Sequence, residues 1–478
     1  MTTLKEALTY DDVLLVPKRS PVVSRKDVDT RTKASKNIWL NIPLISANMD
    51  TVTESAMSIA MAREGGLGII HRFMTIGQQT AEVVKVKRSE SLLIEAPHTV
   101  TTDKSLREAR ELMEDKGIKG LLVTDYSNRL VGVLTNRDIQ FESNFDKKVQ
   151  ESMTGLKDLI TAPVGTTMED AKKILYENRI EKLPIVDSGG YLKGLITAKD
   201  ILKKDRHPQA AKDKKGKLIV GAAIGVKRGF VERASNLLEA GCDLLVVDIA
   251  HGHSDLAINT VKTLKKEFGN VEIMAGNVAT TEGSADLISA GADSIKVGVG
   301  PGSTCVTRII TGSGVPQLTA VMDSVKAAEQ FDVPVVADGG CRTSGDIVKA
   351  LASGASTVFS GFFFAGTEET PGMTVLRSGR KYKIYRGSAS LGTALGRKER
   401  ENKDDEIDPN EYVPEGVESV VPFKGSVTEV IKQLIGGLKS GISYCGAKNI
   451  QEMQKNAEFI KVTQSGIKES GYHDVEKV

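Results

Sequence analysis

The chain has 478 residues, too many for one ordinary domain, and this length predicts two or three domains. Hydrophobic residues make up 40% of it, and 64 basic against 62 acidic residues leave a net charge of +2. This balance gives no bulk attraction to nucleic acid or to a membrane surface. No apolar run approaches the roughly 18 residues of a membrane span, the start lacks a signal core, and the cysteines form no CxxC pair. We therefore expect a cytoplasmic protein with reduced thiols.

The first predicted elements are two short apolar strands, 43–46 and 66–70. The stretch 93–205 then breaks the pattern, because it is an internal repeat in which 117–139 and 179–201 each give a strand, a turn and a second strand. Both copies end in Thr-x-Arg/Lys-Asp.

The two copies, about 93–150 and 151–205, resemble a tandem pair of CBS modules, which often bind adenine nucleotides. The resemblance implies a regulatory site for an adenine or guanine nucleotide. The residues expected at its phosphate and ribose are Thr135, Asp138, Thr197 and Asp200. A plainer interpretation is equally open, in which the two aspartates only cap the helices that follow them.

The second half of the chain alternates strands with helices. Six β-branched runs recur, and the stretches between most of them, such as 230–238 and 344–352, are rich in Ala or Glu with a helical period. The six runs are 218–220, 244–247, 271–274, 294–297, 333–336 and 357–359. Gly, Asp or Asn closely follows each run, which indicates parallel strands joined by crossover helices.

With the two early strands the count is eight, the number in a (β/α)8 TIM barrel. We therefore predict an α/β protein with a discontinuous catalytic barrel, 1–92 and 206–478, and the repeat inserted after the second barrel strand. A doubly wound open sheet is the alternative, but no GxGxxG follows the first strand.

The strongest chemical motif is 298–308, Gly-Val-Gly-Pro-Gly-Ser-Thr-Cys-Val-Thr-Arg, at the end of a predicted barrel strand. Its alternating glycines let the backbone approach a ligand and leave N–H groups free for an anion. Cys305 would lie on the catalytic face of the barrel. Nearby N–H groups and Arg308 would favour its thiolate, the nucleophilic form. A phosphate loop with an idle cysteine fits the spacing equally well.

This loop and the Gly-Val-Pro-Gln at 314–317 resemble the catalytic loop of the inosine monophosphate (IMP) dehydrogenase and guanosine monophosphate (GMP) reductase family. The resemblance covers nearly the whole chain. Further matching segments are 9–15, 49–54, 247–253, 337–340, 365–369 and 443–447.

The resemblance implies that Cys305 attacks carbon 2 of the purine, that hydride leaves to NAD, and that water hydrolyses the thioimidate with help from Thr307. Asp338 would hold the ribose hydroxyls. The phosphate would be bound by Ser303, Gly340, Gly361 and Tyr385, and the base would face Gly387, Ser388 and Glu415. The nicotinamide side of the dinucleotide would meet Asp248, Asn277 and Gly298.

The resemblance also implies a potassium ion, a mobile flap and a homo-oligomer, usually a tetramer. The expected cation ligands are backbone oxygens of Gly300, Gly302 and Cys305, with Glu469, Ser470 and Gly471 of a neighbouring subunit. The flap, 388–424, would enter the vacated dinucleotide site during hydrolysis. Within it Arg400, or Arg397, would serve as the base for water.

The choice between the family's two reactions depends on single residues. Asn48 and Cys341 look like the reductase, which uses NADPH to convert GMP to IMP. Leu391 stands about where the reductase glutamate for ammonia release is expected, and the long flap, the insert and the extended tail also look like the dehydrogenase. The balance favours the dehydrogenase. The reductase and a catalytically silent nucleotide sensor stay open, since Glu401 stands where the flap usually has Tyr.

Overall fold

The computed structural model describes residues 4–89, 94–199, 201, 207–393 and 413–471. It divides into two compact units, one of 1–89 with 209–478 and one of 90–208. The sequence boundaries at 92/93 and 205/206 lie three residues from these divisions. Across the described ranges no helix combines the length and the apolar character needed to cross a bilayer.

The first unit is built on a closed barrel of eight strands, and the predicted (β/α)8 barrel is confirmed. All neighbouring strands pair in parallel, in the order β13-β14-β15-β16-β17-β18-β4-β5. The strands are β4 (Leu44–Ser46), β5 (Leu67–Ile70), β13 (Gly221–Ile224), β14 (Leu244–Asp248), β15 (Ile273–Val278), β16 (Ser294–Val297), β17 (Val335–Asp338) and β18 (Thr357–Ser360).

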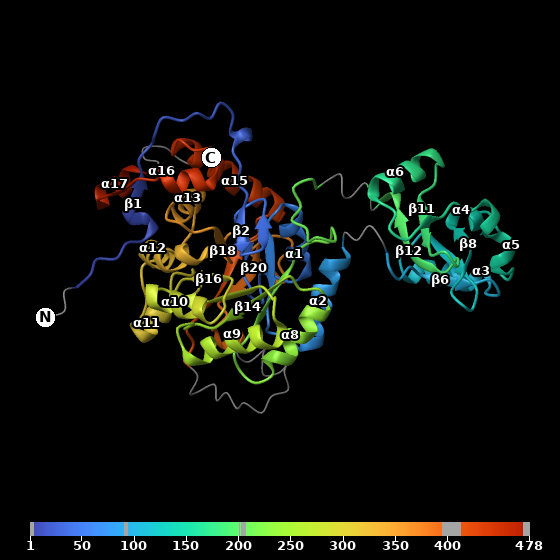
Figure 1. Cartoon of the computed structure of the whole chain (residues 1–478), viewed down its shortest axis with the longest axis horizontal. Coiled ribbons are helices and arrows are strands. Elements are labelled where there is room, and N and C mark those ends of the chain that lie inside the picture. The colour runs from blue at the N-terminus through green and yellow to red at the C-terminus, as the bar shows by residue number, and fades with distance from the viewer. Residues whose placement is uncertain (1–3, 90–93, 200, 202–206, 394–412, 472–478) are drawn as a thin grey trace. The chain divides into compact units, whose positions relative to one another are not determined.

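One helix or more follows each strand, so that helices surround the barrel (Figure 1). They are α1 (Ser55–Arg63), α2 (Ile76–Arg88), α8 (Phe230–Glu239), α9 (Asp255–Phe268), α10 (Thr281–Ser289), α11 (Thr307–Thr311), α12 (Gln317–Ala328), α13 (Ser344–Ala352) and α15 (Val427–Tyr444). Their apolar faces and the outward side chains of the strands form one large buried cluster. A second cluster of inward side chains, including Ile45, Ile69, Val246 and Val336, fills the barrel itself.

One predicted strand was displaced. The run at 218–220 is fully buried but precedes β13, which begins at Gly221. The short apolar side chains of Ala222 and Ala223 carry the barrel position, and Gly221 has no room for a side chain because a Cβ there would lie 2.4 Å from Ile69. The segment that leads into β13 is more hydrophobic than β13 itself, so the hydrophobic pattern placed the predicted strand three residues too early.

Short strands flank the barrel. Near the two ends of the chain, β1 (Val13–Leu15) pairs antiparallel with β22 (Phe459–Lys461), so that Val13 faces Lys461. A hairpin, β2 (Thr32–Ser35) with β3 (Ile38–Leu40), precedes β4. A three-stranded sheet joins β19 (Thr374–Arg377), β20 (Arg380–Arg386) and β21 (Glu418–Pro422). The tail adds α16 (Ile450–Asn456) and α17 (Gln464–Glu469).

The second unit repeats one arrangement of elements. In the first copy β6 (Thr99–Thr101) and α3 (Leu106–Asp115) lead to an antiparallel pair, β7 (Gly120–Thr124) and β8 (Leu130–Thr135), followed by α4 (Asn136–Ile139), α5 (Val149–Ser152) and β9 (Thr154–Gly155). In the second copy β10 (Ala162–Pro163) and α6 (Met168–Glu177) lead to β11 (Lys182–Val186) and β12 (Leu192–Thr197). Each copy has its own core, and a third cluster joins them.

Candidate active site

The carboxyl ends of four neighbouring barrel strands bring the expected ribose and dinucleotide residues together. Asp248 ends β14, Asn277 lies near the end of β15, Gly298 follows β16 and Asp338 ends β17. The Asn277 side-chain amide donates to Oδ2 of Asp338 at 2.9 Å and to the Gly298 carbonyl at 2.8 Å. Residues expected to hold two different ligands therefore share one hydrogen-bonded cluster.

The residue at the centre of this cluster, Lys296, was not among the predicted site residues. Lys296, inside β16, is 2% exposed and contacts both Asp248 and Asp338. Burial opposes its charge, but the two carboxylates outweigh burial and raise the pKa of Lys296. A lysine within an otherwise apolar barrel strand was the signal that could have identified it.

Cys305, on the loop between β16 and α11, lies beside Thr307, the first residue of α11. The Cys305 thiol donates to Oγ1 of Thr307 at 3.2 Å, and the Thr307 hydroxyl donates to Oε2 of Glu415 at 2.7 Å. Glu415 was expected to face the base, and its contact with Thr307 was not foreseen. The three side chains form a continuous chain from a thiol to a carboxylate.

Backbone pairing holds this chain in place. The Val306 N–H donates to the Glu415 carbonyl at 2.9 Å, and the Val417 N–H donates to the Thr304 carbonyl at 2.9 Å. Residues on both sides of Cys305 are thus joined to the segment that carries Glu415. The predicted base-facing residues complete this contact, because the Gly387 N–H donates to the Val417 carbonyl at 3.0 Å and Ser388 follows it half-buried.

Gly298 is required by the close approach of two strand ends. Its φ of 152° lies in a region that other residues rarely adopt, and a Cβ there would lie 2.1 Å from the Asp338 carbonyl oxygen. Gln317 holds the same two strand ends together, since its side-chain amide donates to the carbonyls of Val297 and Asp338 at 2.8 and 3.1 Å. The segment 298–306, called the thiol loop below, therefore begins against Asp338, the residue expected to hold ribose.

Residues expected to bind the phosphate also lie close together. The Ser303 hydroxyl and the Tyr385 hydroxyl are 3.0 Å apart, and a Cβ on Gly361 would lie 3.0 Å from the same Tyr385 oxygen. The Gly340 N–H donates to the Pro301 carbonyl at 3.1 Å, which ties the loop after β17 to the thiol loop. Burial raises the pKa of Tyr385, so its hydroxyl stays protonated and able to donate.

Arg308 does not point at the thiol as a simple charge partner. Its guanidinium donates to the carbonyls of Val299 and Val315, and a Cβ on Gly300 would lie 2.4 Å from its side chain. Burial lowers the pKa of Arg308. Its visible role is to hold the thiol loop against the segment before α12.

Of the expected cation ligands, Gly300, Gly302 and Cys305 lie on the thiol loop, and the Gly302 carbonyl accepts the Cys305 N–H at 3.1 Å. Glu469 ends α17, and the exposed Ser470 and Gly471 follow it.

Within the described residues no group of three or more His, Cys, Asp and Glu side chains could hold a metal ion. Arg397, Arg400 and Glu401 lie outside the described residues.

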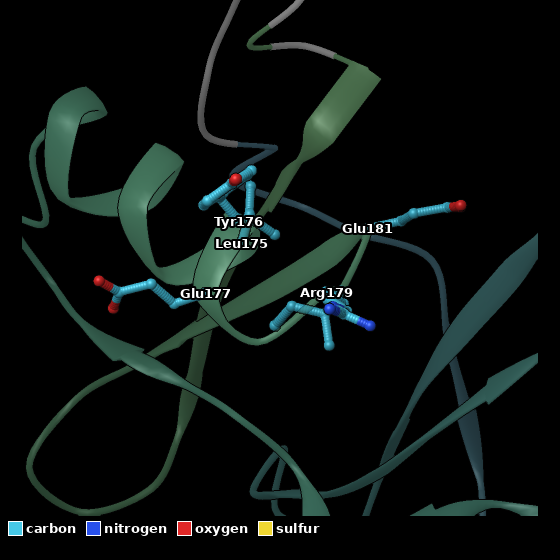
Figure 2. Close-up of a pocket in the computed structure, with 6 residues that line it drawn as sticks. Leu175, Tyr176, Glu177, Arg179 and Glu181 are labelled. Carbon is cyan, nitrogen blue, oxygen red and sulfur yellow. The ribbon is translucent and has the colours of Figure 1, made fainter.

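In the second unit the capping interpretation of Asp138 is visible. Oδ2 of Asp138 accepts from the Thr135 N–H at 2.6 Å and from its hydroxyl at 2.7 Å, at the start of α4. Thr197 ends β12 in the corresponding place, and Asp200 lies outside the described residues. A hollow of about 480 Å³ at the end of α6 contains none of these residues; Figure 2 shows Arg179 and Glu181 among its lining side chains.

The fold defines the class of this protein as a (β/α)8 barrel, and a thiol hydrogen-bonded to a hydroxyl lies beyond the carboxyl end of one of its parallel strands. The chain belongs to the IMP dehydrogenase / GMP reductase family, whose domain matches residues 7–473. It is therefore an oxidoreductase of that family.

Similar proteins carry both names. The chain is 55% identical over 473 residues to the inosine-5′-monophosphate dehydrogenase of Nitrosopumilus maritimus, covering 98% of this chain and 99% of the relative. It is 49% identical over 487 residues to the GMP reductase of Leishmania donovani, covering 100% and 99%. A crystal structure of a cysteine-to-alanine variant of Trypanosoma brucei GMP reductase with guanosine 5′-monophosphate has a TM-score of 0.93 at 45% identity, covering 99% of each chain.

Proposed function

We propose that this enzyme oxidises IMP to xanthosine monophosphate with NAD. The observation that carries the proposal is the chain from Cys305 through Thr307 to Glu415. The Cys305 thiolate attacks carbon 2 of the purine, and NAD, when bound, supplies the acceptor for the hydride that leaves this carbon. The product of this step is a thioimidate between Cys305 and the base.

Hydrolysis of the thioimidate needs a base. Water attacks carbon 2 while Thr307 accepts a proton from it and passes its own hydroxyl proton to the Glu415 carboxylate, 2.7 Å away. The carbon–sulfur bond then breaks, which releases the nucleotide and restores the thiolate. Because guanidinium is almost always protonated, a carboxylate at the end of this chain is a better proton acceptor than a flap arginine.

The remaining expected residues have compatible places. We assign the ribose hydroxyls to Asp338 and the nicotinamide side of NAD to Asp248, Asn277 and Gly298. The phosphate is assigned to the corner formed by Ser303, Gly340, Gly361 and Tyr385. The potassium ion and the tetramer remain proposals that rest on the family, with Gly300, Gly302 and Cys305 as the contribution of one subunit.

Conversion of GMP to IMP with NADPH is the second candidate. Leu391 counted against it, because a glutamate was expected there, yet Glu415 stands beside Thr307 and removes that objection. Asn48 also takes part in the site, since its side-chain amide donates to Oδ2 of Asp248 at 3.0 Å. In that reaction a protonated Glu415 would have to donate through Thr307 to the leaving ammonia, which is the reverse of the proton transfer proposed for the dehydrogenase.

Absorbance at 340 nm distinguishes the two reactions. With IMP, NAD and potassium, the proposal requires a rise that Cys305→Ala abolishes. A fall with GMP and NADPH, and no rise with the first pair, would instead assign the reductase. No change in either mixture would leave only the silent sensor. Omission of potassium from the active mixture tests whether the enzyme needs a bound cation. If the carbonyls of the thiol loop bind potassium, the rate should fall at least about tenfold.

We further propose that the second unit is a pair of CBS modules that binds a nucleotide between its copies. Lys182, which starts β11, reaches across to Gly120 of β7, where a Cβ would lie 3.3 Å from the Lys182 ammonium nitrogen. Burial lowers the pKa of Lys182, and no hydrogen bond or ion pair joins it to another described residue. A half-buried cation near Thr135 and Thr197 favours an anionic ligand such as a nucleotide phosphate.

Calorimetric titration with ATP and with GTP tests this second proposal. Lys182→Met should lower the affinity for the nucleotide at least about tenfold, because a hydrogen bond from a charged group is lost. Lys193→Met is the control, since Lys193 forms an exposed pair with Asp187 in the same copy. Equal effects of the two variants, or no binding by the unchanged protein, would contradict it.

A further inference from the structure

Lys296 joins carboxylates from two other strands of the barrel. Its ammonium nitrogen lies 3.0 Å from Oδ1 of Asp248 and 2.7 Å from Oδ2 of Asp338. It also donates to Oδ1 of Asn277 and lies 4.9 Å from the centre of the Phe359 ring. The three N–H groups thus have three oxygen acceptors, so the ammonium is fully satisfied in a buried position.

The network fixes which carboxylate oxygens remain available. Asp248 receives Lys296 on one oxygen and Asn48 on the other. On Asp338, Oδ2 receives both Lys296 and Asn277, whereas Oδ1 has no hydrogen-bond partner among the described residues. Asp338 therefore presents one oriented oxygen, and its rotation would break two hydrogen bonds.

Charge balance explains why such a cluster persists. Two carboxylates at the same end of a barrel would repel each other if both were ionised without a partner. Burial would raise the pKa of Asp248, but Lys296 and Arg72 outweigh it and lower that pKa. Lys296 therefore helps to keep Asp248 in the ionised form, which accepts hydrogen bonds from hydroxyl groups most strongly.

We propose that Lys296 is a positioning residue that holds Asp338 and Asp248 as one unit, so that the substrate ribose site and the dinucleotide site are set by the same ammonium group. The proposal rests on the assignment of these two acids under the proposed function. It predicts that one substitution, at Lys296, weakens both sites together.

Lys87 provides a matched control near the opposite end of β14. It is also a buried lysine that bridges two aspartates, with 3.0 Å to Asp213 and 2.6 Å to Asp243. Asp243 directly precedes β14, whereas Asp248 ends it. Loss of either lysine leaves a pair of partly buried acids without their shared cation, so a general structural defect should affect Lys87→Met and Lys296→Met alike.

The test compares Lys296→Met, Lys296→Arg and Lys87→Met in the full chain. Lys296→Met should raise the KM for the nucleotide and for the dinucleotide about 10- to 100-fold each, as expected for loss of charge-assisted hydrogen bonds. Lys296→Arg, which keeps the charge, should recover most of both. Lys87→Met should lower the unfolding temperature and leave both KM values within about twofold.

A nucleotide without its ribose hydroxyls gives the second readout. For the unchanged enzyme, the 2′,3′-dideoxy nucleotide should bind about 10- to 100-fold more weakly than the natural one by calorimetry. For Lys296→Met this penalty should fall below about threefold, because Asp338 loses the charged one of its two hydrogen bonds and can rotate about the one from Asn277. An unchanged penalty, or a rise in only one KM, would overturn the proposal.

The binding measurement separates this inference from the reaction itself. If the unchanged chain catalyses neither reaction, the proposed function fails, but nucleotide binding by the unchanged chain and by Lys296→Met still decides whether Lys296 positions Asp338. If Lys296→Met does not fold, Lys296→Gln, which keeps two hydrogen-bonding groups, takes its place and must give the same loss of the hydroxyl-dependent affinity.

Discussion

The four cysteines occupy two kinds of environment. Cys242, Cys341 and Cys445 are buried, whereas Cys305 is partly exposed on its loop. Burial raises the pKa of Cys242 to about 12 and raises the pKa of Cys341 and Cys445 as well. A thiol is nucleophilic as the thiolate, so three of the four cannot compete with Cys305 for an electrophile.

We predict that iodoacetamide at pH 8 modifies Cys305 and leaves the other three cysteines intact in the folded enzyme. A thiol with a pKa near 12 is only about one part in ten thousand thiolate at this pH. Peptide mass spectrometry after a short exposure gives the extent at each site. Saturating nucleotide should protect Cys305, and equal labelling of Cys341 would show that its surroundings are open.

Glu415 and Thr307 should act after the hydride has left. Glu415→Gln keeps the size of the side chain but removes the proton acceptor, so steady-state turnover should fall about 10²- to 10⁴-fold. The first turnover should remain fast, giving a burst of NADH equal to the enzyme concentration. Stopped-flow absorbance measures both phases.

Thr307→Val should give the same burst followed by slow turnover. Thr311→Val, one turn further along α11, is the control, since the Thr311 hydroxyl bonds only within its own segment. Loss of the burst in Glu415→Gln would place this carboxylate before hydride transfer and contradict the role assigned to it.

At the scale of elements, the order of strands and helices was predictable and some of their contacts were not. Ser344–Ala352 is the helix expected from its period, because an amphipathic helix is a local pattern. The Lys296 cluster combines residues from β14 to β17, and its members are far apart in sequence. Glu415 reaches Thr307 across 108 residues. Contacts between residues so far apart in sequence form only when the barrel closes, and no local sequence pattern predicts them.

Gly298, after β16, and Gly312, after α11, have positive φ angles in very different surroundings. Gly298→Ala should destabilise the enzyme by about 3 kcal/mol or more, because the new Cβ meets the Asp338 carbonyl oxygen at 2.1 Å. Gly312→Ala should destabilise the enzyme by only about 1 kcal/mol, because Gly312 has a φ of 69° but open space around it. Thermal unfolding should rank the variants in this order. The reverse order would mean that the strand ends can separate.

At the scale of the whole molecule, the chain contains two units with separate cores. Each unit buries its own apolar side chains, which is the condition for independent folding of a domain. The predicted bound nucleotide of the second unit would therefore act on a barrel that is complete without it.

We predict that residues 90–208 fold alone and that the chain without them keeps its catalytic rate within about twofold. Circular dichroism should give a cooperative melting transition for the isolated segment. The 340 nm assay gives the rate of the shortened chain. An unfolded isolated segment, or a shortened chain without activity, would show that the two cores depend on each other.

The pairing of β1 with β22 has a mechanical consequence. Val13 and Lys461 face each other at the end of the ladder from which both chain termini leave. A force that separates the termini would therefore load one pair of hydrogen bonds at a time, as a zip opens, rather than shearing all of them together. Both tails should peel away at low tension, while the closed barrel should resist to much higher tension.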